Sequence, residues 1–139
     1  MSLKFKVIIK KALNQIIYFG FNYVCPMCGY KARKLMPAGL YERRANAMCP
    51  KCTSLERHRF LYLHLNRHLD QNKNKNFKVL HFAPEKCFIK KLSSLDSLSY
   101  YTSSYPKKGK ANFNFDVTNI EMNDNSFDIL ILNHVLEHV

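Results

Sequence analysis

The segment Phe77-Lys-Val-Leu-His-Phe-Ala83, followed at once by Pro84, indicates the fold class of the second half of the chain. The first seven residues are apolar enough for a strand, and Pro84 suits the first turn of a helix because an N–H at that position would lack a partner. We expect this helix to extend to about Leu95, with Phe88, Leu92 and Leu95 on one face. A strand that leads directly into a helix is the repeating unit of parallel α/β sheets.

Three further strands are predicted after this unit. The first lies near Ser99 to Ser103, the second is short and runs from Asn112 to Phe115, and the third runs from Phe127 to Leu132. The third is a nearly continuous apolar run, which is typical of a strand buried on both faces of a parallel sheet. Residues 77–139 are therefore expected to form a partial Rossmann-like α/β sheet of about four strands.

Two Cys-x-x-Cys pairs, Cys25 with Cys28 and Cys49 with Cys52, are separated by 20 residues. Each pair makes a turn that aims two thiolates at one point, so the spacing predicts a tetrahedral Zn²⁺ site. Four thiolates leave no open coordination position, which favours a structural role over catalysis or thiol redox chemistry. Cys87 lies outside the pattern and is expected to be a small core residue.

The rest of the first half is expected to be helical at both ends. Residues 3–19 have apolar side chains at helical spacing and predict a basic amphipathic helix, for which docking on the rest of the protein is favoured over membrane-surface binding. Thr53-Ser-Leu-Glu56 has the form of a capping box, and a helix should follow to about Asp70. The predicted domains are residues 1–22 (helix), residues 23–71 (zinc-ribbon-like module plus helix) and residues 77–139 (sheet).

The composition of the chain limits the classes of partner and the cellular locations that we expect. The chain has 139 residues, 47% of them hydrophobic, and a formal net charge of +12. Residues 1–76 carry 15 Lys/Arg against 3 Asp/Glu, whereas residues 77–139 carry 7 against 7, so an anionic partner would meet the first half. No apolar run reaches the ~20 residues of a membrane span, and the amino terminus does not read as a secretory signal. With paired cysteines at metal spacing, this predicts a protein of the reducing cytoplasm.

Several segments in this order resemble class I S-adenosylmethionine-dependent methyltransferases, in particular a type-11-like branch with an amino-terminal four-cysteine zinc knuckle. The resemblance implies transfer of a methyl group from S-adenosylmethionine to an oxygen or nitrogen of a small molecule or glycan. It also implies that the methyltransferase domain is truncated at its carboxyl end. The matching segments are Cys25-Pro-Met-Cys-Gly29, Cys49-Pro-Lys-Cys-Thr-Ser-Leu-Glu-Arg-His-Arg59, Val79-Leu-His-Phe-Ala-Pro-Glu85, Phe115-Asp-Val-Thr118 and Ser126-Phe-Asp-Ile-Leu-Ile-Leu-Asn-His-Val-Leu-Glu-His-Val139.

The resemblance also implies which residues meet the cofactor. The segment from Ala83 to Glu85 would run beside its methionine end, Asp116 would accept a hydrogen bond from the adenine amino group, and Asn133 and His134 would close over the sulfonium. An open α/β sheet binds its ligands beyond the carboxyl ends of its strands, where these loops lie. The complete set of expected cofactor residues is His81, Ala83, Pro84, Glu85, Ser104, Asp116, Val117, Asn133 and His134.

Three residues near the end of the chain are the catalytic candidates. His134, Glu137 and His138 share one helical face, where they would support a divalent metal or supply a general base. The favoured alternative is that they pack beside the adenosine as residues of a helix start.

Two expectations concern partners. If the sheet ends at its fourth strand, that strand forms an apolar edge that predicts self-association. The competing interpretation of the whole chain is a zinc-knuckle module that binds nucleic acid or protein through its basic first half, with a non-catalytic remnant domain behind it. A small-molecule or glycan methyl acceptor is favoured over nucleic acid.

Overall fold

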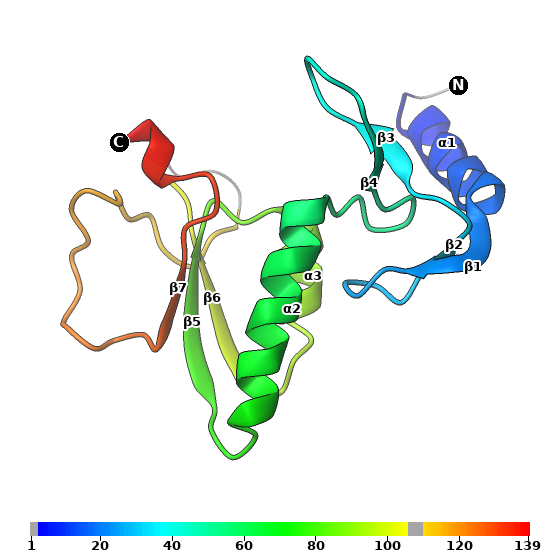
Figure 1. The fold of residues 1–139 in the computed structure, drawn as a ribbon. Helices are drawn as coiled ribbons and strands as arrows, with labels where there is room; N and C mark the ends of the chain where they lie inside the picture. The colour runs from blue at the N-terminus through cyan, green and yellow to red at the C-terminus, as the bar shows by residue number, and fades with distance from the viewer. Residues whose placement is uncertain (1–2, 106–109) are drawn as a thin grey trace. The chain divides into compact units, whose positions relative to one another are not determined.

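The computed structural model describes residues 3–105 and 110–139, and its ribbon is shown in Figure 1. By its internal contacts the chain divides into two compact units, Met1–His68 and Leu69–Val139. The first unit holds the four paired cysteines and the second holds a parallel sheet. The chain is thus a mixed α/β protein, and each unit is described by itself below.

The first unit is built from two helices and two small antiparallel hairpins. It begins with α1 (Leu3–Ile17), and β1 (Phe19–Val24) then pairs with β2 (Lys31–Ala32). The second hairpin pairs β3 (Met36–Ala38) with β4 (Arg44–Met48), and α2 (Glu56–Gln71) begins in this unit. Each hairpin carries an irregularity in its register, so neither offers a long regular ladder.

The second unit is organised by a three-stranded parallel sheet in the order β6-β5-β7. The central strand is β5 (Phe77–Phe82), flanked by β6 (Leu98–Ser103) and β7 (Ile129–Ile131). The short helix α3 (Lys86–Leu92) connects β5 to β6, as the expected strand–helix unit requires. Because parallel strands place their carboxyl ends on one side, the loops after β5, β6 and β7 meet at one edge of the sheet.

Aromatic side chains pack on both faces of this sheet. On one face His81 makes edge contacts with Phe88 of α3 and with Tyr100, at centroid distances of 5.3 and 6.1 Å. Tyr101 points to the opposite face, since successive strand residues alternate, and its ring lies 5.9 Å from Phe113 and 5.7 Å from Phe127. Cys87 is buried, which confirms its expected place in the core.

Two strand predictions were wrong. The segment from Asn112 to Phe115 makes one isolated bridge, Phe113 to Ser103, so the described sheet has three strands. The Asn112 side-chain oxygen accepts from the backbone N–H of Thr102 at 2.9 Å, where a strand would use its own backbone carbonyl.

The last strand is also shorter than the predicted run from Phe127 to Leu132. It begins at Ile129 because the Asp128 carboxylate takes the Lys78 backbone N–H at 2.7 Å. Leu130 is 51% exposed, so this strand is not buried on both faces.

Two helix boundaries were also misplaced. The helix expected to reach Leu95 ends at Leu92, and the Ser94 hydroxyl donates to the Lys91 carbonyl just beyond it. The capping box that starts at Thr53 does not form, because Thr53 has a left-handed backbone (φ +61°) and its hydroxyl donates to the Cys52 carbonyl. Helix α2 begins three residues later at Glu56.

Helix α1 forms almost as predicted. No residue of α1 is buried, so the rest of its own unit does not cover its apolar face. None of the helices in the described residues is long and apolar enough to cross a membrane.

Candidate functional site

The four paired cysteines form a cluster compatible with a metal ion, as the sequence predicts. Their Sγ atoms all lie within 4.8 Å of one another, and the pairs Cys25–Cys52 and Cys28–Cys49 are each separated by 3.7 Å. A tetrahedral zinc site with Zn–S bonds of about 2.3 Å has sulfur–sulfur edges of about 3.8 Å. Within residues 3–105 and 110–139 this is the one group of His, Cys, Asp and Glu side chains that could hold a metal.

The two Cys-x-x-Cys turns have nearly the same backbone geometry. Gly29 N donates to the Cys25 carbonyl at 2.8 Å, and Thr53 N donates to the Cys49 carbonyl at 3.0 Å. Gly29 and Thr53 both have left-handed backbones, at φ +67° and +61°. A left-handed backbone is strained for threonine, a β-branched residue. The turn geometry around Cys49 is therefore imposed by the cluster rather than by the conformational preference of Thr53.

A buried hydroxyl supports the cluster from the second turn. Ser54 is fully buried, and its Oγ lies 3.1 Å from Cys52 Sγ and 3.5 Å from Cys25 Sγ. Thiolates only accept, so in a metal-bound cluster this hydroxyl donates to one of them. The Arg59 guanidinium donates to the Ser54 carbonyl at 2.7 Å and to the Ala47 carbonyl at 3.0 Å, which ties α2 to the turn.

The four cysteine thiols also shift one another's pKa values. Hydrogen bonding from Cys28, Cys49 and Cys52 lowers the pKa of Cys25 far below its usual value, whereas hydrogen bonding to Cys25 and its neighbours raises the pKa of Cys49. Without a cation the group holds some sulfurs ionised only by keeping others protonated. A divalent cation removes this conflict, because it favours the thiolate form of every ligand.

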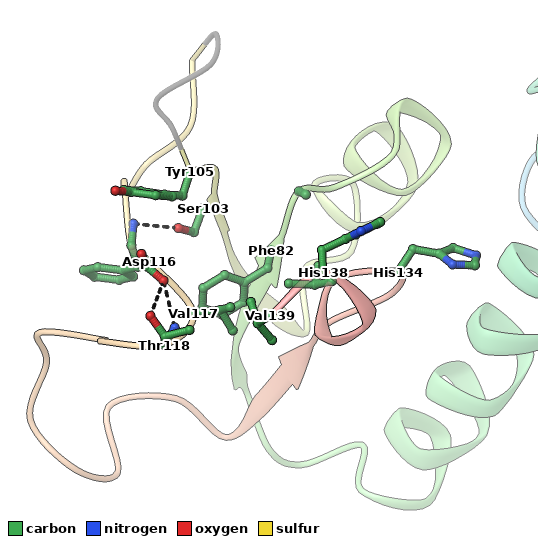
Figure 2. A pocket seen from close by; sticks show the side chains of 12 residues that line it. Phe82, Ser103, Tyr105, Asp116, Val117, Thr118, His134, His138 and Val139 are labelled. Carbon is green, nitrogen blue, oxygen red and sulfur yellow. Dashed lines mark hydrogen bonds between the residues drawn. The ribbon is translucent and has the colours of Figure 1, made fainter.

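The second candidate site is a pocket of about 450 Å³ at the carboxyl ends of the parallel strands, shown in Figure 2. Its volume is in the range of pockets that bind small molecules and cofactors. Asp116 and Tyr105 lie on one side of it, and His138 lies on the other. The lining residues are Phe82, Ala83, Ser103, Tyr105, Phe115, Asp116, Val117, Thr118, His134, Val135, His138 and Val139.

Two features shape the walls of this pocket. Ala83, directly after β5, has φ +45°, a left-handed turn that glycine adopts more readily than alanine, and its N–H donates to the Ser103 carbonyl at 2.8 Å. Asp116 Oδ1 accepts from the Thr118 backbone N–H at 2.9 Å and from its hydroxyl at 2.7 Å. The Thr118 hydroxyl and N–H lower the pKa of Asp116, which holds the carboxylate ionised at the pocket wall.

The predicted cofactor residues fall into two groups. Four of the nine line the pocket, namely Ala83, Asp116, Val117 and His134. Glu85 and Asn133 lie outside the lining, but the Asn133 amide donates to Glu85 Oε1 at 2.5 Å and so joins the loops after β5 and β7.

His81, Pro84 and Ser104 are placed elsewhere. His81 is fully buried in β5, where its Nδ1 lies 3.0 Å from the Tyr100 hydroxyl and its Nε2 lies 3.7 Å from Glu85 Oε2. Burial raises the pKa of Tyr100, so that hydroxyl stays protonated. Pro84 and Ser104 are not among the lining residues.

The three catalytic candidates form a short exposed chain of contacts. His134 Nδ1 lies 2.8 Å from Glu137 Oε1, and His138 Nε2 lies 3.9 Å from the same oxygen. Residues 136–138 form a 3-10 turn rather than an α-helix. His134 and His138 line the pocket and Glu137 does not, which leaves Glu137 as the residue that orients His134.

Some residues of both sites were not predicted. In the sequence Ser54 fits a capping box, and this hides its role beside the cysteines. Its position two residues after Cys52 could have indicated that its hydroxyl lies near the sulfurs. Tyr105 and Thr118 line the pocket from irregular loops, and no sequence periodicity marks them.

No protein-family model matches the chain, and no curated protein or solved structure was found to match it.

Proposed function

We propose that this chain carries the cofactor half-site of an S-adenosylmethionine-dependent methyltransferase, with the cofactor in the pocket beyond β5 and β6. The observation that carries the proposal is the convergence of Ala83, Asp116, Val117 and His134 on one pocket. These residues come from the loops after β5, β6 and β7, and they are four of the residues that the family resemblance implies for the cofactor. A pocket at the carboxyl edge of a parallel sheet is where such folds bind ligands.

The strand order supports the same proposal. With β5 taken as strand one, β6 is strand two and β7 is strand four, and Phe113 makes its bridge on the outer side of β6, where strand three belongs. This arrangement agrees with the order 3-2-1-4 of the doubly wound dinucleotide-binding fold. The left-handed turn at Ala83 stands where that fold usually has a glycine.

The pocket residues then have distinct roles. Asp116, held ionised by Thr118, accepts from the amino group of the adenine, and Val117 provides an apolar wall beside the ring. Asn133 and Glu85 join the two loops that would flank the methionine portion. When bound, S-adenosylmethionine supplies an activated methyl group, so the protein mainly has to orient the acceptor for in-line attack.

His134 is the residue we assign to the acceptor. Its contact with Glu137 Oε1 orients the imidazole, and a histidine held in this way can take a proton from an acceptor hydroxyl or amine. The acceptor class that this chemistry fits is an oxygen or nitrogen nucleophile on a small molecule or glycan.

We further propose that the four cysteines hold a structural Zn²⁺. The 3.7 Å sulfur separations and the buried Ser54 hydroxyl beside two of the sulfurs support this assignment. With four sulfur ligands the ion has no position for substrate, so its role is to hold the two turns together.

Isothermal titration of the zinc-loaded chain with S-adenosylhomocysteine tests the cofactor proposal. We expect micromolar binding that weakens about tenfold in Asp116→Asn, which keeps the Oδ1 acceptor for Thr118 but removes the charge. Asp96→Ala is the matched control, because Asp96 is exposed at the opposite, amino-terminal edge of the sheet. Absence of binding by a folded chain would overturn the proposal and favour the competing zinc-knuckle binding module.

A further inference from the structure

Helix α1 presents an apolar stripe that nothing in the described residues of its own unit buries. Phe5, Ile9, Ala12 and Ile16 recur at positions i, i+4, i+7 and i+11, which lie on one side of a helix. Phe5 is 52% exposed and Ile16 is 74% exposed, and no residue of α1 is buried. Burying such a stripe is normally what stabilises a helix of this length, so α1 needs an apolar environment that its own unit does not provide.

The apolar surface continues into β1, and basic side chains lie over it. Phe21 of β1 is 74% exposed, with the Lys31 ammonium 5.5 Å from its ring centroid. The Tyr30 hydroxyl donates to the Gln15 carbonyl, which ties α1 to the residue that follows the first cysteine turn. Helix α1 and β1 therefore form one surface anchored on the cysteine cluster.

This surface is strongly and uniformly basic. Helix α1 carries Lys4, Lys6, Lys10 and Lys11, all of them exposed, and the chain has no acidic residue before Glu42. The unit Met1–His68 holds 13 Lys/Arg against 2 Asp/Glu, whereas Leu69–Val139 holds 9 against 8. The occupant of the surface must therefore be both apolar and anionic.

We propose that α1 and β1 bind the surface of an anionic phospholipid bilayer, with α1 lying in the headgroup plane. Aliphatic side chains enter the boundary of the acyl chains, and the lysines meet the phosphates. The 15 residues of α1 span about 23 Å, less than the ~30 Å hydrocarbon core, so the helix lies on the bilayer rather than crossing it.

Other occupants fit this surface less well. A second copy of α1 would bring four more lysines and no acid, so the two helices would repel each other. Nucleic acid would satisfy the lysines but offers no environment for Ile8, Leu13 and Ile16, each of which is more than half exposed. The inference is independent of methyl transfer and stands whether or not the cofactor proposal holds.

Co-sedimentation of the zinc-loaded full chain with vesicles tests the proposal. Vesicles of phosphatidylcholine with about one third phosphatidylglycerol should bind the chain, and binding should fall as salt is raised. Lys10→Gln/Lys11→Gln should weaken this binding about 30-fold, from a contribution of about fivefold for each lysine. The matched control is Lys86→Gln/Lys90→Gln, two exposed lysines of the α3 region, which should bind like wild type.

A second variant tests the apolar contribution. Ile8→Ser/Ile16→Ser should weaken vesicle binding by at least tenfold while leaving the fold intact, because neither side chain is buried. Equal binding by the Lys10/Lys11 variant and its control would overturn the proposal, as would a wild-type chain that ignores anionic vesicles but binds RNA or DNA. A dimer in solution that Ile8→Ser/Ile16→Ser dissociates would also overturn it, in favour of a second copy.

Discussion

Replacing Cys49 with serine tests the metal centre most directly, because Cys49 is fully buried and its Sγ lies 3.7 Å from that of Cys28. In a regular tetrahedron the edge is about 1.63 times the metal–ligand distance, so 3.7 Å corresponds to bonds of about 2.3 Å, the Zn–S length. X-ray absorption on the wild-type chain should therefore show one zinc per chain with four sulfurs at that distance.

The variant Cys49→Ser should lose one sulfur and more than 100-fold in zinc affinity, measured by competition with a chromophoric chelator. The estimate is a lower limit, since changes to groups that only hydrogen-bond to ligands already cost about 10- to 100-fold. Cys87→Ser is the matched control, because Cys87 is the fifth cysteine and is buried away from the cluster in α3. Equal zinc affinity in the two variants, or nitrogen and oxygen ligands in the wild type, would refute the reasoning.

Removing the metal should also unfold the surrounding turns. Apart from the cysteines, few apolar side chains are buried in residues 19–54; they are Met27, Ala32, Leu35, Ala47 and Pro50. Such a small core cannot hold two irregular hairpins, so chelation should expose the amides of residues 19–54 to hydrogen exchange. Amides of β5, in the other unit, should stay protected, and loss of protection there instead would contradict this account.

Three further outcomes are expected. Ser54→Ala should weaken zinc binding about 10- to 100-fold in the same chelator competition, because it removes the hydroxyl beside two sulfurs. Tyr100→Phe should lower the free energy of unfolding by about 1 kcal/mol in urea, since His81 Nδ1 loses its hydroxyl partner, and no change would argue against that bond. Arg44 lowers the pKa of Glu56. The stability that this ion pair contributes is therefore present above the ordinary glutamate pKa and is lost as the pH falls through the lowered pKa. Because Arg44→Gln lacks the pair, this variant should lose less stability on acidification than the wild type.

Local patterns were enough to predict the cysteine cluster and the strand–helix unit. Each Cys-x-x-Cys pair lies within one short turn, so its spacing alone predicts that two thiols point to the same place. The same holds for β5, whose apolar run is unambiguous, and for α1, whose helical period is regular. The observed β5 and α1 differ from their predictions by one or two residues at one end, whereas the helix after β5 ends three residues earlier than predicted.

Side-chain competition for backbone groups explains the errors. The side chains of Asn112 and Asp128 each accept a hydrogen bond from a backbone N–H that would otherwise bond to a neighbouring strand. These bonds shorten or remove a predicted strand. Thr53 fits a capping box in sequence, but the cysteine turn fixes its backbone in a conformation that cannot cap α2. Hydrophobic periodicity carries no information about such bonds.

The grouping of the four paired cysteines and the parallel α/β character could be predicted from the amino-acid sequence, because both follow from short-range spacing and strand hydrophobicity. Which residues meet at the pocket could not, since Tyr105 and Thr118 join Asp116 from loops without a hydrophobic pattern. The sequence also could not show that α1 has no buried residue within its own unit, since amphipathicity predicts that a helix has an apolar face but not what covers it. Local backbone structure depends mainly on neighbouring residues, whereas the contacts of a loop or a helix face depend on how the whole chain packs.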